Sequence, residues 1–162
     1  MAAIAVGLGE VAVTRAGSAE HLVAHGLGSC IALCLFDPVS KVAGLAHVVL
    51  PGSDPSDRPN GRFAGSALPA LLDALTAIGG TADPRRYQAR LAGGAHVLAI
   101  GGSRSPRIGA MNAEAVKAAL TAAAVPLVAE DIGGGLGRTV WFDPSDGGLI
   151  RVRTVGGLEV VL

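Results

Sequence analysis

The sequence is poor in aromatic residues and carries no net charge, and each of these shortages narrows what the protein can be. Only five of the 162 residues are aromatic, although half of the chain is hydrophobic. The core must therefore be built from Ala, Val, Leu and Ile. The 13 basic residues are matched by 13 acidic ones, whereas a surface that binds nucleic acid or an anionic membrane needs a basic excess. We expect neither kind of surface on this protein.

Long apolar runs and targeting signals are lacking as well. The sequence contains no uninterrupted apolar stretch of about 18 residues, the length that a membrane-spanning helix needs. Residues 1–9 lack the basic region that opens a secretory signal peptide. A chain of 162 residues has the usual size of one domain and can bury a substantial core. We expect residues 1–162 to form a single domain that resides in the cytoplasm and does not insert into a membrane.

Cysteine is also scarce, and the two thiols predict different roles. Cys30 and Cys34 would lie about 13 Å apart on a strand. A disulfide requires α-carbons within about 7 Å, so the two cannot pair, and their spacing does not match the CxxC motifs. Cys34 lies within an apolar run and is interpreted as a small buried residue. Cys30 follows Gly-Leu-Gly-Ser, where backbone amides can be exposed and glycines let a substrate backbone approach.

The segment that follows Cys30 has the pattern of a buried β-hairpin. Two apolar runs, residues 31–36 and 41–50, flank the segment Asp37–Ser40. Proline directly after an aspartate suits a type I turn. The sequence therefore predicts two antiparallel strands joined by a four-residue loop.

That loop length would place the Cys30 thiol beside the imidazole of His47. Phe36 would pair with Lys41, so Cys30 and His47 would lie directly opposite each other on one face. Opposed β-carbons are roughly 4.5–5.5 Å apart, and a thiol next to an imidazole is the basis of an activated nucleophile. A change of one residue in the loop would instead put the two side chains on opposite faces. We expect the imidazolium of His47 to lower the pKa of Cys30.

The remaining pattern predicts many strands and few helices. One helix is predicted between Ser66 and Gly79, and a second from Asn112, a good N-cap, to Ala124. Further strands are predicted at residues 4–13, 21–25, 85–98, 125–132, 139–142, 149–155 and 158–162. We therefore expect an α+β layered fold with a mainly antiparallel or mixed β-sheet and about two main helices.

The other histidines do not suggest a metal site. No three of the four histidines have metal-ligand spacing, so we expect no metal and no other cofactor. Strand alternation directs His25 to the face opposite that of position 24. Residues 52–61 form a polar loop, and the sequence supports two interpretations of it equally, a lid that contacts substrate and a plain connector.

The sequence around Cys30 and His47 resembles a known family. The run GLGSCIALCLFDPVSKVAGLAHVVLP, residues 26–51, is similar to the signature of the chemoreceptor glutamine deamidase CheD family of bacterial and archaeal chemotaxis. Three further segments resemble the family in order and spacing: LAGGA at 91–95, the IGxxN-xEAV pattern at 108–116, and AEDIGG at 129–134. The resemblance thus spans nearly the whole chain.

This resemblance implies an α/β sandwich like that of the bacterial toxin deamidases, and an activity. The family converts receptor glutamine side chains to glutamate, and related methyl-ester hydrolysis is possible. Cys30 corresponds to the nucleophile and His47 to its base, while the backbone amides of Gly28, Ser29 and Cys30 can stabilise the oxyanion. The implied partners are the helical cytoplasmic domains of chemoreceptors and a CheC-type phosphatase.

One position departs from the family pattern and opens an alternative. The family's third catalytic residue is a threonine six positions before the cysteine, and here that position is Ala24. Either another group orients His47, with a backbone carbonyl, Ser29 and a residue near His96 as the candidates, or the protein has lost useful turnover. In the second case it is a CheD-like binding or regulatory module that docks on receptors or on a CheC-type phosphatase.

Overall fold

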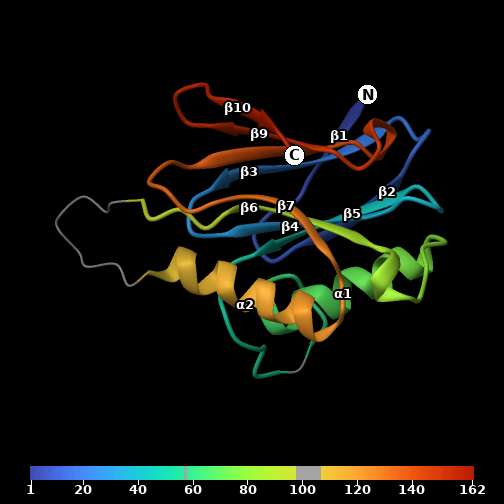
Figure 1. Ribbon diagram of the computed structural model, residues 1–162, viewed down its shortest axis with the longest axis horizontal. Coiled ribbons are helices and arrows are strands. Elements are labelled where there is room, and N and C mark those ends of the chain that lie inside the picture. Colours follow the sequence, from blue (N-terminus) through green and yellow to red (C-terminus); the bar gives the residue numbers. More distant parts are fainter. Residues whose placement is uncertain (57, 98–106) are drawn as a thin grey trace.

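Two β-sheets and a pair of helices form three stacked layers in the computed structural model (Figure 1), which describes residues 1–56, 58–97 and 107–162. One sheet lies against the other, and the helices cover the remaining face of the second sheet. This arrangement confirms the expected α+β sandwich with two main helices, although the strands divide into two sheets. Among the described residues, no helix is long and apolar enough to cross a membrane.

The first sheet contains the first and the last strand of the chain, one at each edge. Its strands lie in the order β1 (Ala2–Ala5), β3 (Glu20–Leu27), β8 (Arg138–Phe142), β9 (Ile150–Thr154) and β10 (Glu159–Val161). β1 is parallel to β3, and the other neighbouring strands are antiparallel. After β1 the chain leaves this sheet for the second one, so the backbone of Val6, itself buried, lies where the chain passes between the sheets.

The second sheet is the central layer, with the hairpin near its middle. Its strands lie in the order β2 (Val11–Arg15), β5 (Val42–Val48), β4 (Ile31–Asp37), β6 (Gln88–Gly93) and β7 (Leu127–Ile132). Every residue of β4 and β5 is buried. Both faces of this hairpin are covered, one by the first sheet and one by the helices, which explains why both strands are almost continuously apolar.

The helices supply one of two apolar cores. α1 (Ala64–Ala77) and α2 (Ile108–Ala122) pack their Leu and Val side chains on the second sheet. The other core fills the space between the sheets and includes Ala24, Cys30 and Cys34. Short 3₁₀ turns at Pro84–Arg86 and Pro144–Asp146 complete the fold. The predicted second helix starts too late, because α2 begins four residues before Asn112, which lies inside the helix and is not its N-cap.

β4 and β5 form the expected hairpin in a different register. Asp37 pairs with Val42, so the loop comprises Pro38–Lys41 and not the predicted Asp37–Ser40. Lys41, the last loop residue, has a φ of 58°, the left-handed conformation that closes the turn. The pairing is thus displaced by two residues relative to the prediction.

The burial of Asp37 explains this register. Its side chain is fully buried, and it accepts hydrogen bonds from the Val39 N–H, the Ser40 hydroxyl and the Arg86 guanidinium. A carboxylate held by these donors is anchored at the end of the strand. Since Arg86 lies 49 residues further along the chain, this anchor is absent from the local sequence pattern.

Candidate active site

Cys30 lies at the mouth of the hairpin, directly before β4. Its side chain is 9% exposed and faces the space between the two sheets. The turn before it, Gly28 and Ser29, has no regular structure. The backbone N–H groups of Gly28, Ser29 and Cys30 make no hydrogen bond to another described residue. Three backbone donors are therefore available beside the thiol.

His47 lies on β5 and is held by the main chain. Its side chain is 2% exposed, and Nδ1 lies 2.9 Å from the carbonyl oxygen of Val6. A carbonyl can only accept a hydrogen bond, so Nδ1 carries the proton and Nε2 is bare when the ring is neutral. Nε2 is buried and has no hydrogen-bond partner within the described part of the chain. The ring therefore presents an unoccupied proton acceptor.

The observed register places Cys30 and His47 on the same face as diagonal neighbours. Ala32 is the residue opposite His47, so the prediction that Cys30 lies directly opposite His47 is wrong. The last paired residues of the two strands are Ile31 and Val48, so Cys30 lies directly beyond the end of this ladder. Because the shift is two residues, the shared face is retained. Diagonal α-carbons are about 7–8 Å apart, and within the described residues His47 Nε2 makes no hydrogen bond to the Cys30 sulfur.

The surroundings of Cys30 favour the neutral thiol over the thiolate. Burial raises the pKa of Cys30, and the interaction with its own backbone N–H offsets only part of that rise. This direction is opposite to the lowered pKa of Cys30 that the sequence predicts. A neutral thiol needs a base that removes its proton during attack, and the bare Nε2 of His47 has that character.

Ala24 is buried on β3, next to the carbonyl that holds His47. Its side chain is fully buried in the core between the sheets. The Val6 N–H donates to the Val23 carbonyl, so Val6 continues the parallel pairing of β1 with β3 alongside Ala24. The hydrogen-bond acceptor for His47 is thus the backbone oxygen of Val6, since the alanine side chain at position 24 has no polar atom.

Glycines allow three backbone segments to meet behind Cys30. A β-carbon on Gly93 would overlap the Cys30 carbonyl, and one on Gly109 would lie 2.5 Å from the Gly94 carbonyl oxygen. Gly93 also has a φ of 116°, which other residues rarely adopt. These contacts account for the glycines of the LAGGA and IGxxN segments, because they bring the first turn of α2 against the strand beside Cys30.

Two further residues contribute to this region, and the sequence analysis assigned neither of them to the site. Val6 holds His47, and Asn112 donates from Nδ2 to the carbonyls of Ser29 and Val49, each at 2.9 Å. A main-chain acceptor has no side-chain signature, and Asn112 was assigned to a helix cap. The spacing of the IGxxN segment relative to the LAGGA segment is the one feature that could have pointed to Asn112.

Other polar groups lie apart from this pair. His25 and His96 are exposed, and among the described residues no three His, Cys, Asp or Glu side chains gather in a way that could hold a metal ion. In the 52–61 loop, the Asp54 carboxylate accepts from Ser56 and from Asn60. These bonds tie Asp54 to Ser56 and Asn60 within the loop.

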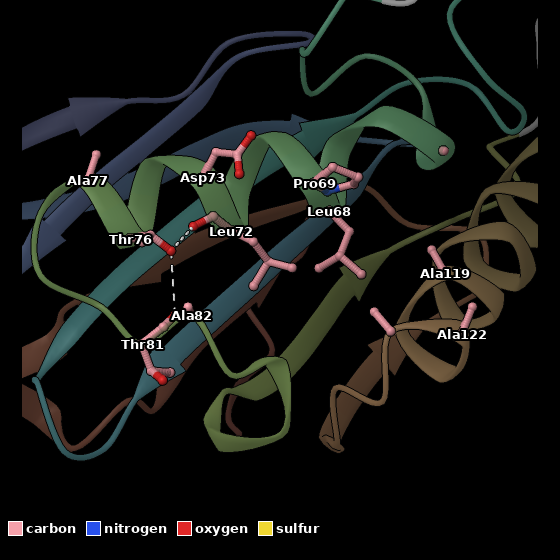
Figure 2. Close-up of a pocket in the computed structure, with 12 residues that line it drawn as sticks. Leu68, Pro69, Leu72, Asp73, Thr76, Ala77, Thr81, Ala82, Ala119 and Ala122 are labelled. Carbon is pink, nitrogen blue, oxygen red and sulfur yellow. Dashed lines mark hydrogen bonds between the residues drawn. The ribbon is translucent and has the colours of Figure 1, made fainter.

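The surface has a groove between the two helices and a separate cleft beside the glycine turn. A groove of about 890 Å³ lies between α1 and α2, where Leu68 and Leu72 face Ala119 and Ala122 (Figure 2). Its lining contains no cysteine or histidine, so it is not the candidate chemical site despite its size. A cleft of about 630 Å³ instead borders the glycine turn at Gly28, and neither Cys30 nor His47 is among the residues that line it.

Known proteins resemble this chain over almost all of its length. A family model described as CheD chemotactic sensory transduction matches residues 49–154. A Thermotoga maritima protein named chemoreceptor glutamine deamidase CheD is 41% identical over 154 residues, which cover 95% of this chain and 93% of that protein. A Desulfitobacterium hafniense protein, named probable chemoreceptor glutamine deamidase CheD, is 38% identical over 162 residues, 98% of each chain.

An archaeal relative extends this similarity. The Archaeoglobus fulgidus protein, also named probable chemoreceptor glutamine deamidase CheD, is 36% identical over 154 residues, 95% of each chain. The family-model match begins two residues after His47. The pairwise matches, which span nearly the whole chain, are therefore the ones that extend over the hairpin.

Proposed function

The chain belongs to the CheD family of chemotactic sensory transduction proteins, and from this we propose that it hydrolyses specific glutamine side chains of methyl-accepting chemotaxis receptors to glutamate. Its relatives carry the name chemoreceptor glutamine deamidase. The reaction replaces a neutral amide by a carboxylate on the receptor and so tunes its signalling. The protein would act in the cytoplasm on the helical domains of the receptors, with a CheC-type phosphatase as a further partner.

The proposed first step is attack by Cys30 on the amide carbonyl carbon. His47 Nε2 takes the thiol proton as the sulfur–carbon bond forms, since the raised pKa of Cys30 leaves little thiolate beforehand. The carbonyl oxygen becomes an oxyanion, which the unengaged N–H groups of Gly28, Ser29 and Cys30 can stabilise. The imidazolium keeps its orientation because Nδ1–H donates to the Val6 carbonyl.

The second half of the reaction returns the enzyme to its starting state. The imidazolium of His47 protonates the leaving nitrogen, the carbon–nitrogen bond breaks, and ammonia departs from a thioester on Cys30. Water then attacks the thioester carbonyl while Nε2 accepts its proton. The carbon–sulfur bond breaks, the proton passes to the sulfur, and glutamate is released from a neutral thiol.

One observation carries this proposal. His47 Nε2 is buried on the same face of the hairpin as Cys30 and has no hydrogen-bond partner among residues 1–56, 58–97 and 107–162, while Nδ1 is committed to the Val6 carbonyl. A histidine with only a structural role would be expected to use both ring nitrogens when buried. A free acceptor on the face of the hairpin that also carries the Cys30 thiol supports general-base catalysis.

The test is conversion of glutamine to glutamate on a receptor cytoplasmic fragment, followed by mass spectrometry together with ammonia release. The wild type should convert the substrate, and Cys30→Ala and His47→Ala should not. Cys34→Ala is the matched control, because it removes the other thiol of the same strand face and should retain turnover. Loss of activity in Cys34→Ala with retention in Cys30→Ala would contradict the assignment.

The alanine at position 24 favours a second candidate function. A CheD-like protein without its family threonine can retain receptor or CheC-type binding while lacking turnover. The same experiment separates the two functions. A wild-type protein that binds a validated receptor fragment, yet is as inactive as Cys30→Ala, would support the binding module and exclude the deamidase.

A further inference from the structure

We propose that Asn112 is a positioning residue that sets the geometry of the Cys30 peptide at the open end of the hairpin. Its side chain is fully buried, and Nδ2 donates to the carbonyls of Ser29 and Val49, each at 2.9 Å. Ser29 directly precedes Cys30, and Val49 follows the strand of His47. One side chain of α2 therefore joins the backbones of both candidate catalytic segments.

These two carbonyls lie where the ladder between β4 and β5 ends. Ile31 and Val48 form the last pair of the two strands. Beyond it, the Val49 N–H donates at 2.9 Å to the segment before α1 and does not cross to the other strand. Each backbone carbonyl needs a donor, and the two protons on Nδ2 of Asn112 provide one for each. The amide thus fixes the separation of the strands at the point where they diverge.

The bond to Ser29 also fixes the direction of the Cys30 N–H. The carbonyl of Ser29 and the N–H of Cys30 belong to one planar peptide and point in opposite directions. Since Asn112 holds the carbonyl toward α2, the N–H is held away from the helix, where it makes no hydrogen bond to another described residue. This N–H lies beside the Cys30 thiol and is a proposed donor to the oxyanion. Asn112 therefore sets the direction in which the Cys30 N–H meets the sulfur and the oxyanion.

The oxygen end of the Asn112 amide indicates that this residue acts as a hydrogen-bond donor. Asn112 Oδ1 is buried and has no hydrogen-bond partner within the described ranges. An unsatisfied buried acceptor destabilises a protein, and a leucine of similar size would avoid that loss. The structure keeps the acceptor unsatisfied while it uses both donors.

The position of α2 makes this contact possible. Gly109 lies in the first turn of the helix, and its Cα side is packed against the carbonyls of Gly94 and Ala95. Asn112 follows about one turn later and therefore projects at the level of the turn that carries Cys30. The glycine contacts and the Asn112 bonds form one continuous link from helix to nucleophile.

The first test is alkylation of Cys30 by iodoacetamide as a function of pH, which needs no receptor. Asn112→Leu keeps the size of the side chain and removes both donors. We expect its alkylation profile to shift to higher pH, because the thiolate loses an aimed N–H. Mass spectrometry of the labelled peptide gives the rate at each pH.

The second test is turnover on the receptor fragment, and only this readout rests on the proposed function. We expect kcat of Asn112→Leu to fall by about 10², the usual loss for one oxyanion donor, with KM changed by less than about threefold. KM is retained because Asn112 does not reach the substrate. Tyr87→Phe is the matched control: it removes a side-chain bond to the Thr81 carbonyl near the closed end of the hairpin, and should leave the profile and kcat unchanged.

The outcomes separate this inference from the proposed function. A folded Asn112→Leu protein with the wild-type alkylation profile and kcat would overturn the inference. If that variant does not fold, hydrogen exchange in the wild type decides: both Nδ2 protons of Asn112 should be protected, and their rapid exchange would overturn it. A shifted profile in a protein whose wild type shows no turnover would support the positioning role and contradict the deamidase.

Discussion

The imidazole of His47 is oriented by the backbone of a segment that is distant in sequence. Its Nδ1 donates to the Val6 carbonyl, 41 residues away. In triads of this kind, the third group holds the imidazole in the tautomer that leaves Nε2 free to move protons. In the proposed mechanism the carbonyl of Val6 has this role, beside the position where Ala24 replaces the family threonine.

For this reason we expect Ala24→Thr to change turnover by no more than a few fold, whereas a tautomer that was not already fixed would allow a gain of up to about 10⁴. Ala24 is fully buried in the core between the sheets. The added atoms should therefore lower stability by about 1–3 kcal/mol through overpacking. Receptor-fragment turnover and thermal unfolding measure the two effects. A large gain in turnover would show that Val6 does not orient His47.

The two thiols should differ in reactivity, and neither should be a preformed thiolate. Cys30 is 9% exposed and Cys34 only 1%, so Cys30 should be alkylated first. Burial raises the pKa of both thiols. Below its pKa a thiol gains thiolate about tenfold per pH unit, so the labelling rate of Cys30 should still rise with pH through neutrality. Iodoacetamide labelling with mass spectrometry measures it, and a rate that is already constant at neutral pH would contradict this prediction.

At the scale of elements, the hairpin shows what local sequence can and cannot predict. The two apolar runs and the Asp-Pro pair correctly predict two strands and put Cys30 on the same face as His47. The predicted register was wrong because the observed register is fixed by the contact of Asp37 with Arg86, which belongs to another part of the chain. A count of loop residues cannot reveal a partner that is distant in sequence.

The same ion pair makes a prediction about stability. Burial alone would raise the pKa of Asp37, but hydrogen bonds from Arg86, Ser40 and two backbone N–H groups outweigh it and hold the pKa well below its usual value. We expect Asp37→Asn to lower the free energy of unfolding at neutral pH by about 2 kcal/mol, less than for a fully buried pair because Arg86 is partly solvated.

The pH dependence of this effect has a defined sign. Because the pKa of Asp37 is lower in the folded state than in the unfolded state, its stabilising effect is complete when the pH is above the ordinary aspartate pKa, near 4. The effect is lost as the pH falls toward the folded-state pKa. The difference between the wild type and Asp37→Asn should therefore shrink in acid. Urea unfolding at neutral pH and at about pH 3 measures it. Asp83→Asn, which alters an exposed pair with Arg85, is the control with little effect.

The second helix illustrates another limit of local pattern. Asparagine at the apparent start of a helix is typical of an N-cap, yet α2 begins at Ile108 and buries Asn112 against the hairpin end. The reason is the close approach of Gly109 to Gly94, which pulls the helix start toward Cys30. Packing between distant glycines overrides the local preference for a cap.

At the scale of the whole molecule, the pairing of distant strands escapes the sequence. β3 joins β1 on one side and β8 on the other, and the pairing of Ala24 with Val140 links residues more than a hundred positions apart. The strand count and the presence of two helices follow from patterns of apolar residues. The division into two sheets depends on these long-range pairings, and it is this division that brings Val6 over His47.

We expect the three layers to unfold together, as the proposal of a single domain over residues 1–162 requires. Trp141 is the only tryptophan and lies in the first sheet, Cys34 lies between the sheets, and helical circular dichroism reports on the third layer. In urea, tryptophan fluorescence, Cys34 labelling and circular dichroism should give coincident transitions. Midpoints that differ between these probes would show that the layers unfold as separate units.

Because a main-chain carbonyl holds His47, replacing side chains one at a time cannot remove the interaction. An alanine at position 6 would present the same oxygen, so a scan of that kind would leave the orienting group of His47 undetected. An ester in place of the peptide bond after Val6 would weaken the acceptor and leave every side chain intact. By the same reasoning, the path of the chain carries the interaction, and the side chain at position 6 contributes only packing in the core between the sheets.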